Sequence, residues 1–202
     1  MIFYKNFFGW SQSLAILIFT LIPVTAVFPA NAMSGENTMT RTEKAEFREF
    51  SKGLKYELLF RNLGKQVFSE LKSKPPGSMT SNSLELLNKM EEHNTVVMAP
   101  VRDQYDVDSE IGCKDKLLAK TVTLALKTMP YLGTRYLEGS AERFVRQLKE
   151  IEASSPEGYE TQMTYMVEHE EALHRYLVHL NNGDQQRAHS VLENFVVDYN
   201  IQ

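Results

Sequence analysis

From Thr42 to the end of the chain, apolar residues recur every three or four positions, and no segment shows the alternation of a β-strand. Such spacing gives a helix one apolar face, which must be buried against another helix. The longest stripe contains Phe47, Phe50, Leu54, Leu58, Phe60, Leu63, Val67 and Leu71. The sequence therefore predicts an all-α fold.

Proline, glycine and polar clusters divide this pattern into segments. Pro100 should end the second helix, Pro130 should kink or split the third near Met129, and Asn182-Gly183 should end the fourth. The predicted helices span residues 42–72, 83–98, 116–151, 156–181 and 184–197. This order predicts an antiparallel bundle of about four long helices plus a short C-terminal helix.

Residues 1–32 have a different character. Lys5 is their only charge, an apolar run covers Leu14 to Ile22, and Ala30-Asn31-Ala32 places small residues where a signal peptidase cuts. These three parts are typical of a secretory signal peptide. We therefore expect residues 33–202 to form a single helical-bundle domain that is exported, to the periplasm or the medium.

An uncleaved membrane anchor is the alternative for this segment. The apolar stretch from Leu14 to Phe28 is fifteen residues long and is interrupted by Pro23 and Thr25. A spanning helix needs about 20 residues to cross the hydrocarbon of a bilayer. The sequence therefore predicts no stable membrane span after cleavage.

Charge and cysteine usage narrow the classes of partner. The 22 basic and 26 acidic residues are interspersed, and no basic stripe is present to neutralise phosphates, so nucleic acid is not expected as a partner. Cys113 is the single cysteine, so it has no partner for a disulfide within the chain. A protein partner and a second copy of the chain remain the candidate partners.

Polar residues on the apolar face of the fourth predicted helix are the first candidates for a site. Its stripe passes through Met166, Leu173, Leu177 and Leu180. At 3.6 residues per turn, that stripe crosses His169 and Glu170, which should point inward. Glu171 and His174 are three residues apart and share a face.

The second predicted helix repeats this pattern. His93 falls on the line of Leu86, Met90 and Val97, and Glu91 and Glu92 adjoin it. A polar group buried without a partner costs several kcal/mol, so each inward His or Glu needs one. A hydrogen-bonding side chain and a metal ion are the two kinds of partner that suit these groups.

The segment Glu171-Ala172-Leu173-His174 has the Glu-x-x-His spacing of a metal ligand pair. The last forty residues, with this segment, resemble ferritin-like helical-bundle proteins, which hold two metal ions with such motifs on two helices and single glutamates on two others. The resemblance implies iron or another transition metal, used for oxygen or peroxide chemistry. It implies His93, His169 and His174 as ligands, with Glu170 or Glu171 as the carboxylate.

The second helix departs from that family pattern, because Glu91-Glu92-His93 places the residues side by side rather than three apart. Glu57 and Glu138 are the candidate single carboxylates, and neither lies clearly on an apolar face. The leading hypothesis is an exported ferritin-like protein that binds a transition metal. The alternative is a non-catalytic exported helical interaction protein without metal, whose inward polar groups fix the register of its helices.

Overall fold

The computed structural model describes residues 41–107 and 112–201, and within them the chain is helical with no strand. The predicted signal peptide, residues 1–32, lies outside the described residues. The helices are α2 (Arg41–Leu71), α3 (Ser81–Gln104), α4 (Cys113–Thr128), α5 (Pro130–Ala153), α6 (Glu160–Asn181) and α7 (Gln185–Asp198). Among the described helices, none combines the length and apolar character that a membrane crossing requires.

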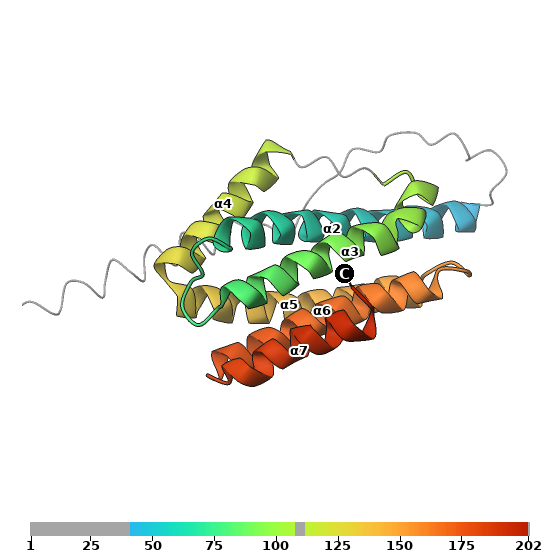
Figure 1. The fold of residues 1–202 in the computed structure, drawn as a ribbon. Coiled ribbons are helices and arrows are strands. Elements are labelled where there is room, and N and C mark those ends of the chain that lie inside the picture. Colours follow the sequence, from blue (N-terminus) through green and yellow to red (C-terminus); the bar gives the residue numbers. More distant parts are fainter. Residues whose placement is uncertain (1–40, 108–111, 202) are drawn as a thin grey trace, which may run out of the picture. The chain divides into compact units, whose positions relative to one another are not determined.

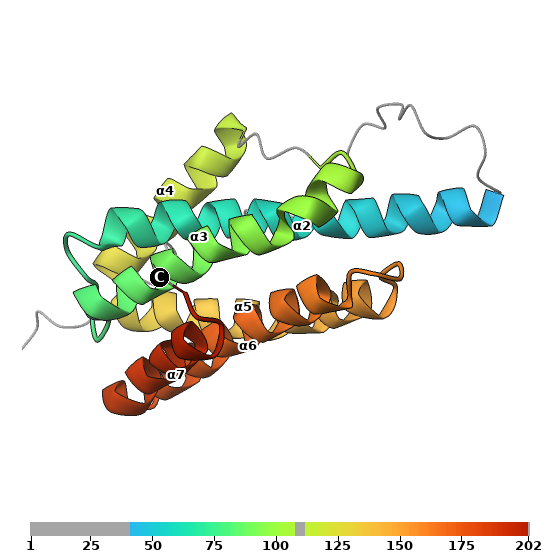
Figure 2. The ribbon, with the colours of Figure 1, turned by 45° about the vertical axis from the view of Figure 1, so that its right-hand side comes forward.

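The helices pack as two groups that face each other. Helices α2 and α3 lie side by side, and α6 lies between α5 and α7 (Figures 1 and 2). The two groups meet where α3 packs on α6 and α7 and where α2 packs on α5, while α4 packs on α2 and α5. The predicted all-α class is confirmed, but the described residues form six helices rather than four long helices and one short one.

The additional helix arises at Pro130, where the predicted break is a complete split. Met129 leaves the helical conformation with φ −136° and ψ 64°, and Pro130 becomes the first residue of α5. Proline suits that position because its missing N–H has no acceptor there in any helix. Gly133 then permits a close approach, since a Cβ at this position would lie 2.9 Å from Leu126 Cδ2.

The predicted end of α3 at Pro100 is wrong. The helix continues through Pro100 to Gln104. Pro100 is exposed, so water can reach the carbonyl that its ring leaves without an N–H donor. The following turn is held by burial of Val101 and Arg102, and this tertiary packing outweighs the local cost of the proline.

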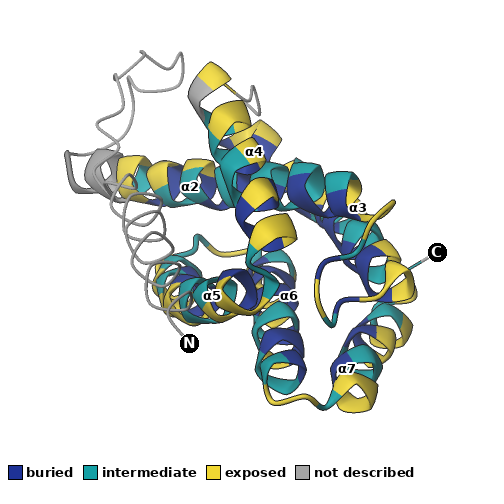
Figure 3. Ribbon diagram, turned by 90° about the vertical axis from the view of Figure 1, so that its left-hand side faces the viewer, coloured by how far each residue is buried: buried dark blue, intermediate teal, exposed yellow. Residues whose placement is uncertain are grey.

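The core consists of two apolar clusters, one toward each end of the helices. One cluster includes Val67, Phe68, Leu84, Met90, Tyr176 and Leu177. The other includes Leu54, Leu58, Met98, Val101, Met163 and Met166. The buried residues Arg61 on α2, Glu91 on α3 and His169 and Glu170 on α6 lie in sequence between members of the two clusters. Figure 3 shows the buried faces of the helices and the arrangement of α6 between α5 and α7.

Candidate functional site

We call the connected network of buried polar residues on α2, α3 and α6 the charged layer. Its members are Glu57 and Arg61 of α2, Glu91, Asn94 and Arg102 of α3, and His169 and Glu170 of α6. Each of these residues is at most 6% exposed. Glu57 is buried, although the sequence does not place it clearly on an apolar face; it and Arg61 lie at helical spacing from Leu54 and Leu58.

Arg61 occupies the centre of the charged layer. Its Nη1 donates to Glu91 Oε1 at 3.3 Å and to His169 Nδ1 at 2.7 Å, and its Nη2 donates to Glu170 Oε2. Its Nε lies 3.5 Å from Glu57 Oε1. One guanidinium thus contacts three carboxylates and an imidazole from three helices, as its planar fork of donors allows.

A second arginine joins the layer from the last turn of α3. Arg102 Nη2 donates to Glu57 Oε2 at 2.8 Å and to Asn94 Oδ1 at 2.9 Å. Glu57 therefore lies between two guanidinium groups. This contact links the end of α3 to the middle of α2, and it explains why the turn after Pro100 remains helical.

Aromatic rings enclose the polar groups. The Arg61 guanidinium lies 5.3 Å from the centre of the Phe144 ring of α5, which is within range of a cation–π interaction. The His169 ring lies 6.0 Å from Tyr165 and 5.8 Å from Phe195, centre to centre. The charges therefore interact in a medium from which water is largely excluded.

Burial sets the protonation of the layer. Loss of hydration raises the pKa of Glu91 to about 8; Arg61 opposes this shift, and Glu170 and Glu57 add to it. Burial and the Arg61 charge hold the pKa of His169 well below its ordinary value of 6.5. The Arg61 pKa is raised, because the charges of Glu91, Glu170 and Glu57 outweigh the desolvation of the guanidinium.

The raised pKa of Glu91 favours a protonated carboxyl group at this position. Two guanidinium groups face three carboxyl groups, so full ionisation would leave one uncompensated negative charge. A proton on Glu91 removes it. His169 is neutral and accepts from Arg61 at Nδ1, so its own proton is on Nε2, 3.9 Å from Glu91 Oε2. Among the described residues, neither Glu91 Oε2 nor His169 Nε2 has a hydrogen-bond partner.

The structure separates the five residues that the sequence predicts as metal ligands. His169 and Glu170 lie in the charged layer, buried as the helical spacing predicts. His93 is half-buried, with its ring 5.4 Å from that of Tyr165. Glu171 forms an ion pair with Lys149 at 2.7 Å, and His174 is half-buried outside the layer.

Among residues 41–107 and 112–201, no three His, Cys, Asp or Glu side chains converge as a metal ion would require. Glu171 pairs with Lys149 rather than with a residue of the layer, and Arg61 already pairs with the three carboxyl groups of the layer. The residues present therefore do not form a ready site for the two metal ions of a ferritin-like centre. Glu138, a candidate single carboxylate, instead accepts from Asn181 Nδ2 at 2.6 Å.

Sequence reasoning missed the members of the layer that carry positive charge. Arg61 and Arg102 are long and charged, and such residues are almost never fully buried unless paired. A signal was present on α2, because Leu58, Arg61 and Phe68 share one face at helical spacing. Asn94 shows the same spacing on α3, because it lies four residues from both Met90 and Met98.

Comparison of the chain with protein-family models, with curated proteins and with solved structures finds no match. The function is therefore inferred from the geometry of the charged layer.

Proposed function

We propose that this chain is a non-catalytic exported helical protein that acts by binding, and that its charged layer is a structural element. The observation that carries the proposal is the position of the Arg61 guanidinium among Glu57, Glu91 and Glu170. It supplies the positive charge that these carboxylates require, in the space that a metal ion would need.

The position of the layer in the core supports a structural role. Apolar clusters lie on both sides of it along α2, α3 and α6. A shift of one of these helices by a turn would place a charged group against apolar side chains and remove its partners, which is costly. Buried polar groups fix helix register in this way in coiled coils.

The second candidate is the transition-metal site of a ferritin-like protein. Its support is the pair of unpartnered atoms, Glu91 Oε2 and His169 Nε2, which face each other at 3.9 Å. Imidazole nitrogen and carboxylate oxygen are both ligands of iron and zinc. Such a site would require Arg61 to leave its present position and a further ligand to approach.

Metal analysis of the purified protein separates the two candidates. After growth with added iron and zinc, we expect less than about 0.1 equivalents of iron, manganese, zinc or copper per chain. A chelator should leave the melting temperature unchanged, because it can lower the stability only by removing a bound metal. Two results together would favour the metal site over the structural proposal. The protein would contain about one metal ion per chain, and a chelator would lower the melting temperature of the wild type but not that of Glu170→Gln.

The matched control for that substitution is Glu142→Gln. Glu142 is on α5, its side chain is 58% exposed, and it pairs only with Arg146 on the surface. The same loss of one carboxylate there should change neither the metal content nor the response to a chelator.

Export is the part of the proposal that rests on residues 1–32. Cleavage after Ala32 removes Trp10, the single tryptophan of the chain. Mass spectrometry of the protein recovered from the periplasm or medium should give an N-terminus at or near Met33. Exported protein that retains Trp10 would contradict cleavage of a signal peptide.

A further inference from the structure

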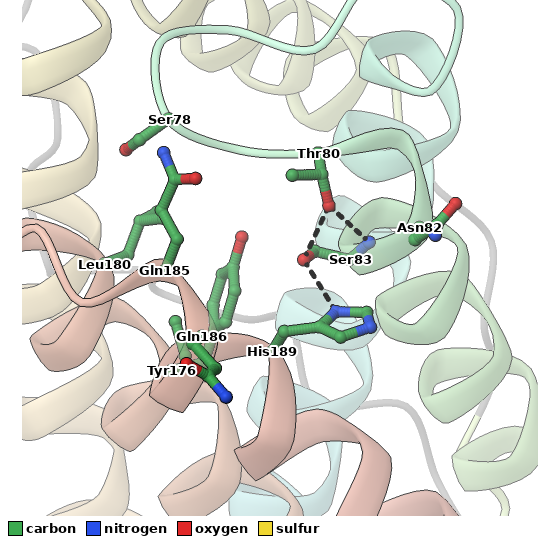
Figure 4. Close-up of a pocket in the computed structure, with 10 residues that line it drawn as sticks. Ser78, Thr80, Asn82, Ser83, Tyr176, Leu180, Gln185, Gln186 and His189 are labelled. Carbon is green, nitrogen blue, oxygen red and sulfur yellow. Dashed lines mark hydrogen bonds between the residues drawn. The ribbon is translucent and has the colours of Figure 1, made fainter.

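A pocket of about 440 Å³ lies between the segment that leads into α3, the last turns of α6 and the start of α7 (Figure 4). Its polar groups already bind one another. The Thr80 hydroxyl donates to Ser83 Oγ at 3.0 Å, and Ser83 Oγ lies 3.2 Å from His189 Nδ1. Thr80 also caps α3, Asp184 caps α7, and Glu193 pairs with His189. These contacts leave no unpaired charge in the lining of the pocket.

The outer face of α4 is different, because its apolar side chains are exposed. Helix α4 packs on α2 and α5, and its residues Ala119, Val122 and Leu126 join an apolar cluster of the core. Leu117 and Leu124 are 67% and 59% exposed. They are two turns apart and share one face, whereas Leu126 is two and a half turns from Leu117 and lies on the opposite side. The helix therefore has a second apolar face, in addition to the one that its packing requires.

Exposed apolar side chains are concentrated around α4. Among the described residues, six large apolar side chains are exposed, and four of them belong to Leu117, Leu124, Tyr131 and Leu132. The last two are in the first turn of α5, directly after α4. In Figures 1 and 2 the amino-terminal part of α4 extends beyond α2, and Figure 3 shows exposed residues along α4. Such a concentration indicates an interaction site, which scattered single residues do not.

The threonines on this face add no unpaired donor. Thr121 Oγ1 donates to the Leu117 carbonyl at 2.9 Å, and Thr128 Oγ1 donates to the Leu124 carbonyl at 2.8 Å. Both hydroxyl groups therefore form hydrogen bonds within α4. The stripe from Leu117 to Thr128 can leave water without stranding either hydroxyl hydrogen.

A row of lysines runs beside the exposed leucines. Lys120 is three residues after Leu117 and four before Leu124, so it lies at the edge of their stripe. Lys116 and Lys127 continue the row toward the two ends of the helix, and all three lysines are exposed. No ion pair or hydrogen bond joins their side chains to another residue in the part of the chain that the structure describes. Their charges are therefore available to a partner.

The charge of α4 is opposite to that of the chain as a whole. The helix contains four lysines and one aspartate, whereas the chain has a net charge of −4. The aspartate, Asp115, accepts from the Gly112 N–H at 3.0 Å at the start of the helix. At physiological salt, charges more than about 8 Å away are largely screened. An anionic surface that touches α4 would therefore interact mainly with its lysines.

A membrane surface that contains anionic phospholipids suits both features of this face. Leucine side chains enter the boundary between headgroups and acyl chains, and lysine side chains reach back to the lipid phosphates. A second copy of the chain suits the face less well, because contact between two α4 helices would bring two groups of positive charge together.

We propose that α4 docks this protein on a membrane surface that contains anionic phospholipids. Leu117 and Leu124 would enter the headgroup layer, and Lys116, Lys120 and Lys127 would lie beside the phosphates. The inference rests on the binding role proposed above and names its partner. The metal content, which tests the structural role of the charged layer, has no bearing on it.

Co-sedimentation with phospholipid vesicles tests this proposal, with protein recovered from the periplasm or medium. One set of vesicles contains phosphatidylcholine alone, and the other contains phosphatidylcholine and phosphatidylglycerol in equal parts. Binding to the anionic vesicles should be at least about tenfold tighter, because each lysine close to such a surface contributes about fivefold to the affinity. Raising the salt from about 0.1 M to about 1 M shortens the Debye length from about 10 Å to about 3 Å and should remove most of this difference.

Two leucine substitutions test the apolar part of the contact. Leu117→Gln combined with Leu124→Gln should weaken binding to the anionic vesicles at least about tenfold, because two apolar side chains no longer enter the headgroup layer. The matched control is Val96→Gln combined with Val197→Gln, at side chains of α3 and α7 that are 71% and 74% exposed. It should leave the affinity within about twofold of the wild type.

Neutral substitutions of the lysines test the electrostatic part. Glutamine at all three exposed lysines of α4 should make the affinities for the two kinds of vesicle equal. The control removes the same charge at three exposed lysines that pair with glutamates elsewhere, which are Lys52, Lys72 and Lys149. The control protein should keep its preference for anionic vesicles.

Three results would overturn the proposal. The first is equal affinity of the wild type for both kinds of vesicle, or no binding to either. The second is binding that neither set of α4 substitutions changes, which would place the contact elsewhere, in a retained signal segment for example. The third is a dimer in analytical ultracentrifugation that Leu117→Gln with Leu124→Gln dissociates, without vesicle binding, which would assign the face to a second copy. Thermal unfolding of each variant verifies that it is folded.

Discussion

Glu91 shows how strongly burial decides the state of a single residue in this protein. Its carboxyl group is 2% exposed, and its pKa is raised from 4.5 to about 8. Its neighbours on α3 give no indication of this in the sequence, where Glu91 and Glu92 are equivalent. The difference arises because α2 and α6 cover Glu91 and leave Glu92 exposed.

The raised pKa of Glu91 predicts a specific pH dependence. The folded protein holds the proton of Glu91 more tightly than the unfolded chain does. The stability that this proton contributes is complete below pH 4.5 and is lost as the pH rises toward 8. Glu91→Gln imitates the protonated acid and cannot ionise. The free energy of unfolding of the wild type, relative to Glu91→Gln, should therefore fall by about 1 kcal/mol per pH unit between pH 5 and pH 7.

Urea unfolding at several pH values measures this difference. Glu142→Gln, on the surface of α5, is the control and should give a difference that does not change over the same range. Parallel curves for the wild type and Glu91→Gln would mean that Glu91 is ionised in the folded protein throughout this range.

Arg61 is the residue whose loss should be most damaging. Arg61→Met leaves Glu91 and Glu170 buried without their cation and His169 without its donor, which should cost about 3–5 kcal/mol of unfolding free energy or prevent folding. Arg146→Met removes a surface pair whose side chains are about 60% exposed, and should cost within about 0.5 kcal/mol. Similar values for both variants, by chemical denaturation, would contradict the central role of Arg61.

At the scale of the helices, the sequence predicts which residues are buried most reliably when one face of the helix is clearly apolar. On α6 the spacing of Met166, Leu177 and Leu180 places His169 and Glu170 inward, and both are buried. On α3 the apolar residues occur in adjacent pairs, so the face is ambiguous. Leu86 and Val97 suggest a line through His93, whereas the buried residues are Leu87, Met98 and, between them, Glu91 and Asn94.

The limits of helix prediction have a related cause. Pro130 and Pro100 have the same local chemistry, yet one separates two helices and the other lies within one. What distinguishes them is the environment of the next turn. After Pro100, Val101 enters the core and Arg102 binds Glu57, and both contacts are with residues distant in sequence.

The two prolines should therefore respond differently to replacement by alanine. Pro100→Ala restores an N–H donor inside α3 and should raise the free energy of unfolding by about 1 kcal/mol, since proline is unfavourable in a helix interior. Pro130→Ala replaces a residue that suits the first position of a helix, and should be neutral or slightly destabilising. Thermal and urea unfolding of both variants gives the comparison, and stabilisation by Pro130→Ala alone would contradict the account of α3.

At the scale of the molecule, the charged layer divides one core into two apolar clusters, and this division determines what the charges contribute. Replacing a buried ion pair by apolar residues of similar volume is often neutral or stabilising. We therefore expect that the layer is not required for net stability. Its expected contribution is specificity, because partners on α2, α3 and α6 are satisfied together in one register.

An apolar version of the layer tests this separation of stability from specificity. Leu or Met is introduced together at all seven positions of the layer, which are Glu57, Arg61, Glu91, Asn94, Arg102, His169 and Glu170. The free energy of unfolding should equal or exceed that of the wild type. The amide spectrum in nuclear magnetic resonance should lose dispersion or show more than one set of peaks, because helices that can shift by a turn no longer meet an electrostatic penalty. An unfolded variant would show that the charges supply net stability. One sharp, well-dispersed set of peaks would show that apolar packing alone sets the register, and this result would refute the role proposed for the layer.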